Sequence, residues 1–284
     1  MIKYNINVIG FGDNVVDKYE NTKIMYPGGN SLNFAVYAKF LGVKKSAYMG
    51  YFGNDKEAKH VIDTLSELEV ETSNCKQLEG ENGCARVTIE NGERIFLGSN
   101  NGGVRGKIPF ILSNDNLEYL KSFDLLHTGN YSFTENELNK IRALNVPISF
   151  DFSDDSTIEY YEKVTPNINY AFCSFDGTED EIKEHLKKIV NLGAELACAS
   201  RGKKGCILFD GEKYFIQEAI LLDRIEDTMG AGDSLITAFL INYLTKIKAG
   251  IEKEVAIMES LNEAANFAAK TCMLKGSFGY GEKY

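Results

Sequence analysis

The chain has 284 residues, of which 44% are hydrophobic and 25% are charged, and its formal net charge is −10 at pH 7. These values are typical of soluble globular domains and exclude disordered, collagen-like and coiled-coil chains. The negative charge argues against nucleic acid and anionic membranes as partners, and no apolar stretch approaches the roughly 20 residues that a membrane-spanning helix needs.

The first part of the chain alternates strand and helix patterns. We predict a strand at 5–10, a helix at 31–41, a strand at 45–50 and a helix at 55–68. The N-terminus therefore lacks the basic and apolar regions of a secretory signal, and the six cysteines are scattered without a C-x-x-C pair. We expect a cytoplasmic protein with reduced cysteines.

Residues 83–97 break this alternation. Ala85, Val87 and Ile89 alternate with polar residues, and Asn91-Gly92 then offers a hairpin turn. We predict a hairpin that projects from the main sheet. Such a hairpin can act as a lid that closes over a ligand and excludes water.

From residue 124 onward the alternation of strands and helices resumes. Single strands are predicted at 124–127, 147–151, 170–173 and 196–199, followed by a strand pair at 206–209 and 213–216. Helices are predicted at 179–192, 231–244 and 251–271. This order predicts an α/β fold with a doubly wound, mainly parallel sheet that binds ligands at the carboxyl ends of its strands.

A glycine-rich turn, Asp227-Thr-Met-Gly-Ala-Gly-Asp233, runs directly into the helix at 231–244. Backbone N–H groups of Gly230, Ala231 and Gly232 can converge there on a phosphate, at the positive end of the helix. A carboxylate at this place repels phosphate, so Asp233 is best explained as a base for a hydroxyl beside a transferable phosphoryl group. The alternative is that Asp233 only caps the helix.

Two signatures, in order along the chain, resemble those of the ribokinase-like (PfkB) carbohydrate kinases. The first is Pro27-Gly-Gly-Asn-Ser-Leu-Asn-Phe-Ala-Val36, followed by Met49-Gly-Tyr-Phe-Gly-Asn-Asp55, and the second is the glycine-rich turn. The resemblance covers essentially the whole chain. It implies one ribokinase-like domain over 1–284, with a small β lid from about 11–30 and 83–98, and ATP-dependent phosphorylation of a sugar with Asp233 as the catalytic base.

The resemblance also implies which residues bind the sugar. In this family the paired glycines let the backbone approach the sugar, and an asparagine at the position of Asn33 hydrogen-bonds its hydroxyls. The segment Gly12-Asp-Asn-Val-Val-Asp17 is similar to the first sugar-binding turn of the family. The implied sugar-binding residues are Asp13, Asp17, Gly28, Gly29, Asn30 and Asn33. The alternative is ordinary loop polarity, since Asn and Asp are common in turns.

The nucleotide side of the resemblance rests on two segments. Ala199-Ser-Arg-Gly-Lys-Lys-Gly205 is similar to a turn that approaches the ATP phosphates, and Asn266 lies in a segment similar to the helix that flanks adenine. The implied nucleotide-binding residues are Ser200, Gly202, Gly205 and Asn266. A P-loop kinase is disfavoured because no Walker A string occurs.

Two cation sites follow from the resemblance. Asp227 matches a position that helps to bind a monovalent cation such as K⁺ in many relatives. Mg²⁺ is expected with ATP, because it normally neutralises the phosphates during such transfers. The Asn-x-x-Glu that organises Mg²⁺ in the family is missing after the strand at 170–173, where Asp176, Glu179 and Asp180 are the alternatives, acting through water.

Several strings are closest to one bacterial branch of the family, the fructoselysine 6-kinases, which phosphorylate the 6-hydroxyl of a fructosamine. These strings are Gly12–Asp17, Gly28–Tyr37, Phe150–Asp154, Asp227–Ser234 and Ala268–Thr271. The resemblance therefore implies fructoselysine or a related fructosamine as substrate. The alternatives are another PfkB kinase for fructose, ribose, a keto-deoxy sugar acid or a nucleoside, and an inactive regulator that binds sugar and nucleotide.

Two further expectations concern the lid and a histidine. The projecting hairpin makes a homodimer through the lid our expectation for the quaternary structure. His127 ends a predicted strand, where it either faces the ligand or has a structural role.

Overall fold

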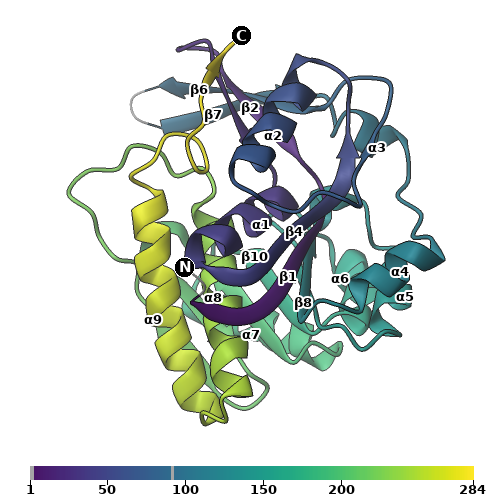
Figure 1. Ribbon diagram of the computed structural model, residues 1–284. Helices are drawn as coiled ribbons and strands as arrows, with labels where there is room; N and C mark the ends of the chain where they lie inside the picture. The colour runs from purple at the N-terminus through teal and green to yellow at the C-terminus, as the bar shows by residue number, and fades with distance from the viewer. Residues whose placement is uncertain (1–2, 91–92) are drawn as a thin grey trace.

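The larger of two β-sheets organises the molecule (Figure 1). The computed structural model describes residues 3–90 and 93–284. The sheet has the strand order β13-β12-β11-β10-β9-β8-β1-β4-β5, and β12 and β13 at one edge pair antiparallel while the others pair parallel. Its strands are β1 (Tyr4–Gly12), β4 (Val43–Phe52), β5 (Lys76–Gln77), β8 (Leu125–Gly129), β9 (Ile148–Asp151), β10 (Tyr170–Ser174), β11 (Leu196–Ser200), β12 (Cys206–Phe209) and β13 (Tyr214–Gln217).

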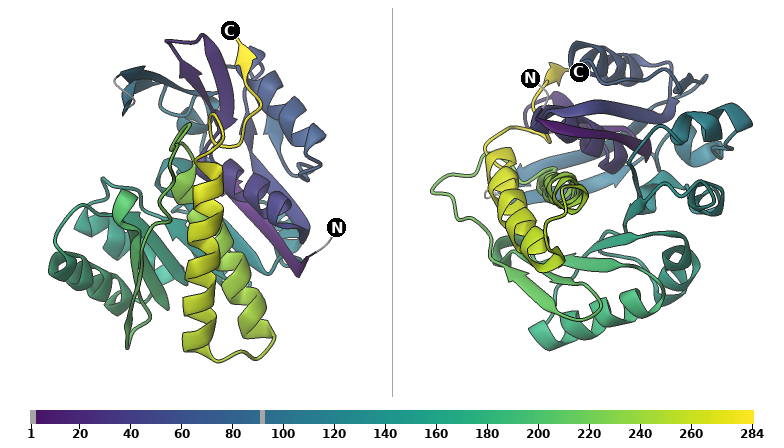
Figure 2. Two further views of the ribbon diagram at one scale, coloured as in Figure 1. Left: turned by 90° about the vertical axis from the view of Figure 1, so that its left-hand side faces the viewer. Right: turned by 60° about the horizontal axis from the view of Figure 1, so that its bottom comes forward.

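Helices cover both faces of this sheet (Figure 2). One face packs on α1 (Asn30–Leu41), α8 (Ala231–Lys248) and α9 (Lys253–Thr271). The opposite face packs on α4 (Asn114–Leu120), α5 (Leu138–Arg142), α6 (Ile158–Val164) and α7 (Glu179–Asn191). Side chains of β1 alternate between these two cores, with Ile6 and Val8 in one and Ile9 and Phe11 in the other.

Short helices complete the chain. They are α2 (Lys56–Glu67), α3 (Val104–Lys107) and the 3₁₀ turns η1 (Asn130–Ser132), η2 (Thr165–Asn167) and η3 (Gly202–Lys204). Within the described ranges, no helix is both long and apolar enough to cross a membrane.

The smaller sheet forms the lid. Its strand order is β14-β3-β2-β6-β7, and its strands are β2 (Val15–Tyr19), β3 (Ile24–Gly28), β6 (Gly83–Glu90), β7 (Glu93–Ser99) and β14 (Glu282–Lys283). The antiparallel pairing of β6 with β7 confirms the predicted hairpin. Its predicted turn at Asn91-Gly92 lies outside the described residues.

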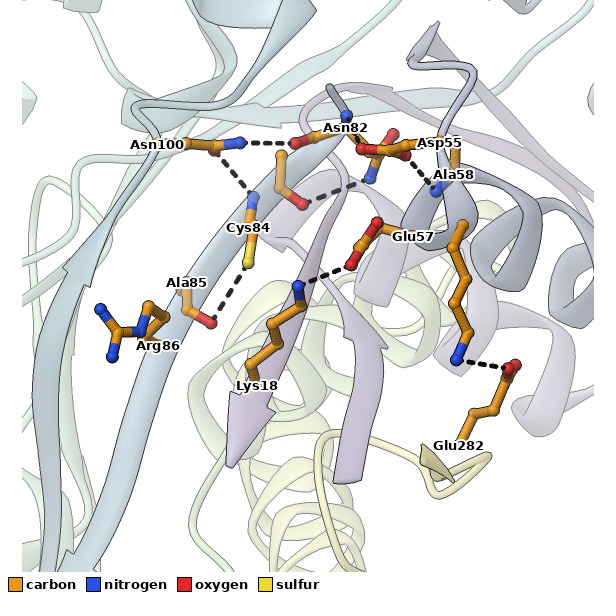
Figure 3. A network of polar contacts seen from close by, with 12 residues as sticks. Lys18, Asp55, Glu57, Ala58, Asn82, Cys84, Ala85, Arg86, Asn100 and Glu282 are labelled. Atoms are coloured by element: carbon orange, nitrogen blue, oxygen red, sulfur yellow. Dashed lines mark hydrogen bonds and ion pairs between the residues drawn. The ribbon is translucent and has the colours of Figure 1, made fainter. Parts of the chain in front are cut away.

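Polar contacts hold the outer face of the lid against the start of α2 (Figure 3). The Lys18 ammonium of β2 lies 2.6 Å from the Glu57 carboxylate. Asp55 accepts hydrogen bonds from the backbone N–H groups of Ala58, at 2.9 Å, and of Asn82, at 2.9 Å. Asp55 therefore caps α2 and at the same time fixes the chain that leads into β6.

The predicted strands and long helices are confirmed, with bounds that differ from the predicted ones by a few residues at most. The helix predicted at 179–192 begins after Thr178, whose hydroxyl and Glu181 form a reciprocal cap, and Gly193 follows it with a φ of 124°. The C-terminal strand β14 was not predicted from the sequence, because two residues carry no periodicity.

Candidate active site

The candidate site lies where the strand order reverses. The chain passes from β1 to β4 on one side of β1 and later adds β8 on the other side, so the strand order reverses at β1. Such a switch point opens a crevice at the carboxyl ends of the strands. The starts of α1 and α8 meet at this crevice, because Asp233 of α8 contacts Asn30 and Asn33 of α1. Two helix N-termini therefore face one place.

Asp233 is held between two side-chain amides. One carboxylate oxygen accepts a hydrogen bond from Asn30 Nδ2 at 2.8 Å and the other from Asn33 Nδ2 at 2.6 Å. Burial raises the pKa of Asp233 to about 6, although the two amide hydrogen bonds lower it. The carboxylate is therefore ionised at neutral pH and still basic enough to accept a proton from a hydroxyl.

The turn before Asp233 requires glycine and leaves donors open. Gly230 has a φ of 74°, and a Cβ on it would lie 2.2 Å from the Tyr37 hydroxyl. A Cβ on Gly232 would meet nothing within 4 Å, so the space beside it is open. Within the described part of the chain, the N–H groups of Gly230, Gly232 and Asp233 have no protein acceptor, whereas that of Ala231 donates to the Thr228 carbonyl at 3.3 Å. The open donors suit an anion at the helix start.

Asp227 ties the lid to this turn. Its carboxylate accepts hydrogen bonds from the backbone N–H groups of Met229, at 3.0 Å, and Gly276, at 3.1 Å, and from the Tyr19 hydroxyl of β2. Met229 also packs on the lid residues Tyr19 and Tyr26. The contacts of Asp227 therefore join the lid, the turn and the segment after α9.

Asp13 and the paired glycines shape the start of α1. The Asp13 carboxylate accepts hydrogen bonds from the backbone N–H groups of Asn30, at 2.7 Å, and Ser31, at 3.0 Å, and so caps this helix. Gly29 has a φ of 110°, and a Cβ on Gly28 would lie 2.7 Å from a carboxylate oxygen of Asp17. The structure thus brings the predicted sugar-side residues together.

One side-chain oxygen of Asn33 is a hydrogen-bond acceptor that is not used within the described part of the protein. Asn33 Nδ2 donates to Asp233 and, at 3.1 Å, to Ser277 Oγ. Asn33 Oδ1 is buried and has no hydrogen-bond partner among the described residues. Because buried polar atoms are normally paired, this oxygen is suited to a hydroxyl that a ligand supplies. Ser277 was missed by the sequence analysis, since it follows α9 outside both signatures.

The predicted nucleotide residues lie at three places. Ser200 and Gly232 line one small cavity together with Asp151 and Ser174, so the structure brings Ser200 next to the anion turn. Gly202 and Gly205 form the turn after β11, with φ values of 55° and 81°. Asn266 is exposed on α9, and its amide donates to the Asn262 carbonyl of the same helix at 2.8 Å.

Asp151 and His127 join the site through Asn30. The Asp151 carboxylate accepts a hydrogen bond from Asn30 Nδ2 at 2.9 Å, and its pKa is raised to about 7 by burial and by the charge of Asp233. His127 Nε2 lies 2.9 Å from Asn30 Oδ1. Both residues stand at the ends of predicted strands, but the sequence offers no signal that one asparagine connects them.

The carboxylates proposed for Mg²⁺ lie at the surface. Asp176 and Asp180 are exposed, and Glu179 pairs with Lys183. Among residues 3–90 and 93–284, no group of three or more His, Cys, Asp and Glu side chains is placed to hold a metal ion. The donor set therefore favours an Mg²⁺ that is bound mainly by the nucleotide and water.

Comparison with protein families gives one match over nearly the whole chain. The family described as "pfkB family carbohydrate kinase" matches residues 1–277. The chain is 41% identical to "Fructosamine kinase FrlD" of Bacillus subtilis (strain 168), over 98% of this chain and 95% of that protein. It is 27% identical to "Fructoselysine 6-kinase" of Escherichia coli (strain K12), over 94% of this chain and 97% of that protein.

Solved structures share the fold. The ribokinase of Arabidopsis thaliana, complexed with ribose and ATP, has a TM-score of 0.79 at 20% identity, over 97% of this chain and 95% of that one. A putative ribokinase II from E. coli, in complex with ATP and Mg²⁺, has a TM-score of 0.75 at 18% identity, over 96% and 94% of the two chains. These similarities confirm the ribokinase-like α/β fold with a small β lid.

Proposed function

The chain belongs to the pfkB family of carbohydrate kinases, and we propose that it transfers the γ-phosphoryl group of ATP to the 6-hydroxyl of fructoselysine or a related fructosamine. The observation that carries the proposal is the position of Asp233. This carboxylate lies at the start of α8, beside open backbone N–H groups, and two amides fix its orientation. A base and an anion site side by side are what transfer of a phosphoryl group to a hydroxyl requires.

The chemistry follows from this arrangement. Asp233 accepts the proton of the sugar hydroxyl while the hydroxyl oxygen forms a bond to the γ-phosphorus, and the bond from that phosphorus to the β,γ-bridging oxygen of ATP breaks. The N–H groups at Gly230 and Gly232 then face the charge on the moving phosphoryl oxygens. We assign Ala231 to the same anion hole on the basis of the family signature. In the structure its N–H donates a hydrogen bond to the Thr228 carbonyl oxygen.

For the sugar, we propose the set implied by the first signature. Asn33 Oδ1 is an acceptor without a hydrogen-bond partner among the described residues, and it lies on the same side chain that holds Asp233. Asp17, Gly28 and Gly29 complete this side of the proposed site, and neighbouring atoms leave no room for a side chain on either glycine. Asp13 and Asn30 belong to the same proposed sugar-binding set, and in addition Asp13 holds the start of α1 and Asn30 holds Asp233.

For the nucleotide, we propose that Ser200, Gly202 and Gly205 face the ATP phosphates and that Asn266 lies toward adenine. Support comes from the cavity that Ser200 shares with Gly232. Mg²⁺ supplies charge neutralisation on the phosphates when it is bound. A monovalent cation at Asp227 remains a prediction, since this carboxylate already accepts bonds from three protein donors.

Three other predictions are retained as proposals. They are a single domain over residues 1–284, a cytoplasmic location and a homodimer through the lid. The described part of β7 exposes Ile95, Phe96 and Leu97, which supports a partner for the lid.

The choice of a fructosamine is tested by substrate competition. ADP release is measured with fructoselysine, fructose, ribose and a nucleoside, and the product is located by phosphorus NMR. We expect kcat/KM for fructoselysine to exceed that for fructose by at least about tenfold, because the lysine part adds contacts worth roughly 1.4 kcal/mol or more. A ratio near one, or a preference for ribose or the nucleoside, contradicts the fructosamine assignment but not the kinase. ATP binding without turnover of any sugar would instead indicate a regulator.

A further inference from the structure

One amide connects two carboxylates in the site. Asn30 Nδ2 donates one hydrogen to Asp233, at 2.8 Å, and the other to Asp151, at 2.9 Å. Asn30 Oδ1 accepts a hydrogen bond from His127 Nε2 at 2.9 Å. The two carboxylates come from α8 and β9, so a single side chain of α1 sets the position of each relative to the other.

His127 is held so that it can donate in only one direction. It is fully buried in β8, its ring stacks on Phe34 with centroids 4.7 Å apart, and its Nδ1 lies 3.0 Å from Ser149 Oγ. Burial lowers the pKa of His127 to about 3, so the ring is neutral and carries one N–H. Because Asn30 Oδ1 can only accept, that hydrogen is on Nε2, and Nδ1 accepts from the Ser149 hydroxyl.

His127 and the two carboxylates favour the same orientation of the Asn30 amide. Turned by half a rotation, the amide would place its oxygen against the carboxylates of Asp233 and Asp151, which is repulsive, and its NH₂ group against His127 Nε2, which could then accept only if the ring proton moved to Nδ1. The hydrogen bond from His127 therefore reinforces, from the far side of Asn30, the orientation that serves the base.

From this geometry we propose that His127 is a positioning residue for phosphoryl transfer, which acts through Asn30 to aim Asp233 at the sugar hydroxyl and to keep Asp151 apart from it. The inference rests on the proposed function, in which Asp233 is the base. It makes the structural role of His127 specific, since the ring is fully buried behind Asn30 and acts on the reaction only through that side chain.

The role predicts a signature in the pH profile. The groups that face Asp233 are Asn33 and Tyr37 of α1, Asp13 just after β1 and, across Asn30, Asp151 of β9. Burial and, to a smaller extent, the negative charge of Asp13 raise the pKa of Asp233, and the hydrogen bonds from the Asn33 and Asn30 amides lower it. If Asn30 loses its orientation, one opposing bond is lost, and the pH below which the base is protonated rises.

The test compares three variants of the full chain. His127→Leu removes the donor, and we expect kcat to fall roughly tenfold to a hundredfold, the range of a lost hydrogen bond to a charged group. The acid limb of kcat should move up by about one pH unit, while the dissociation constant of ATP, measured by calorimetry, stays within about twofold. His127→Gln keeps an N–H at a similar reach and should restore both kcat and the acid limb.

Thr128→Val is the matched control. Thr128 is the next residue of β8, is equally buried, and bonds Thr134 Oγ1 at 2.7 Å on the other face of the sheet. This variant should lose stability without any shift of the acid limb. If His127→Leu does not fold, Ser149→Ala tests the same chain of bonds one step further out and should shift the limb in the same direction by less.

The proposal is overturned if His127→Leu folds and keeps the acid limb of the wild type, or if His127→Gln is as impaired as His127→Leu. Failure of the underlying function looks different, because Asp233→Asn would then retain activity. Loss of activity in Asp233→Asn together with an unchanged limb in His127→Leu would contradict the role of His127 alone.

Discussion

At the scale of single residues, the site is a group of four carboxylates. Among the described residues, few positively charged side chains contact them. Asp13 is satisfied by the start of α1, Asp227 by the lid and the turn, and Asp233 and Asp151 by a shared amide. The first two therefore build the structure, whereas the second two have raised pKa values and are chemically available. The proposed base therefore differs from the other aspartates in its surroundings and not in its residue type.

The raised pKa of Asp233 predicts how the rate depends on pH. The base must be ionised to accept a proton, and its pKa is about 6, above the usual value for Asp because of burial. We expect kcat to fall as the pH drops through about 6 and to be constant between about 7 and 8. The measurement is kcat at saturating ATP and sugar from pH 4.5 to 8.5. An acid limb near pH 4 would show that Asp233 is not desolvated, or that the base is another group.

The same residues show which parts of the site can be predicted from the sequence and which cannot. The sequence predicts a role for Asp233 from the chemistry of its glycine-rich turn and a role for Asn33 from the family resemblance, and the structure brings these two side chains together. The bonds of Asn30 could not be predicted, because its partners His127, Asp151 and Asp233 are separated from it by 97, 121 and 203 positions. Such pairings depend on which strand ends become neighbours, and no local pattern encodes that.

At the scale of elements, the lid is assembled from three separate parts of the chain. β2 and β3 follow β1, β6 and β7 form the hairpin, and β14 is added by the C-terminus to the edge of β3. The family match ends at residue 277, so β14 lies beyond it. Its contacts include Glu282 with Lys56 and His60, and the Tyr284 ring with the Lys18 ammonium.

We expect β14 to support the lid over the sugar. β3 ends at Gly28, beside Asp17, so an unsupported β3 would loosen the sugar side and leave the nucleotide side intact. Deleting Glu282–Tyr284 should raise KM for the sugar severalfold, about threefold to tenfold, with KM for ATP changed by less than about twofold.

Glu282→Gln is the control for this deletion. It removes the ion pair of an exposed carboxylate with Lys56 and its contact with the His60 ring, and exposed ion pairs contribute about 0–1 kcal/mol, so its KM should match the wild type. An unchanged KM for the sugar in the deletion variant would mean that β14 only covers an edge.

At the scale of the whole molecule, the order of helices and strands along the chain could be predicted better than the order in which the strands lie side by side in the sheet. Alternating strand and helix patterns indicated a parallel sheet with ligands at its carboxyl ends, and the structure has that sheet. The reversal of strand order at β1, which opens the crevice, follows from packing of distant segments and has no sequence pattern of its own. The short strand β5 and the helices α4 to α6 also lack enough residues to show a clear periodicity.

The site itself is a product of the whole chain. The start of α1, the ends of β8 and β9, the turn before α8 and Ser277 after α9 all contribute to it. The proposed function gives these segments a common purpose, since it requires a base, an anion site and a sugar site within one crevice under the lid. We propose Asp233 as the residue at which the three meet.

The most direct test of this account is therefore Asp233→Asn, compared with the wild type and with Asp223→Asn, an exposed aspartate of the preceding loop. Because general-base catalysis contributes about 10² to 10⁴-fold, we predict that kcat with the preferred sugar falls by that factor in Asp233→Asn. ATP binding, measured by calorimetry, should be kept or become tighter, since a negative charge beside the phosphates is gone, and Asp223→Asn should behave as the wild type. An Asp233→Asn protein that folds, binds ATP and turns over within a few-fold of the wild type would contradict the assignment of the base and with it the proposed mechanism.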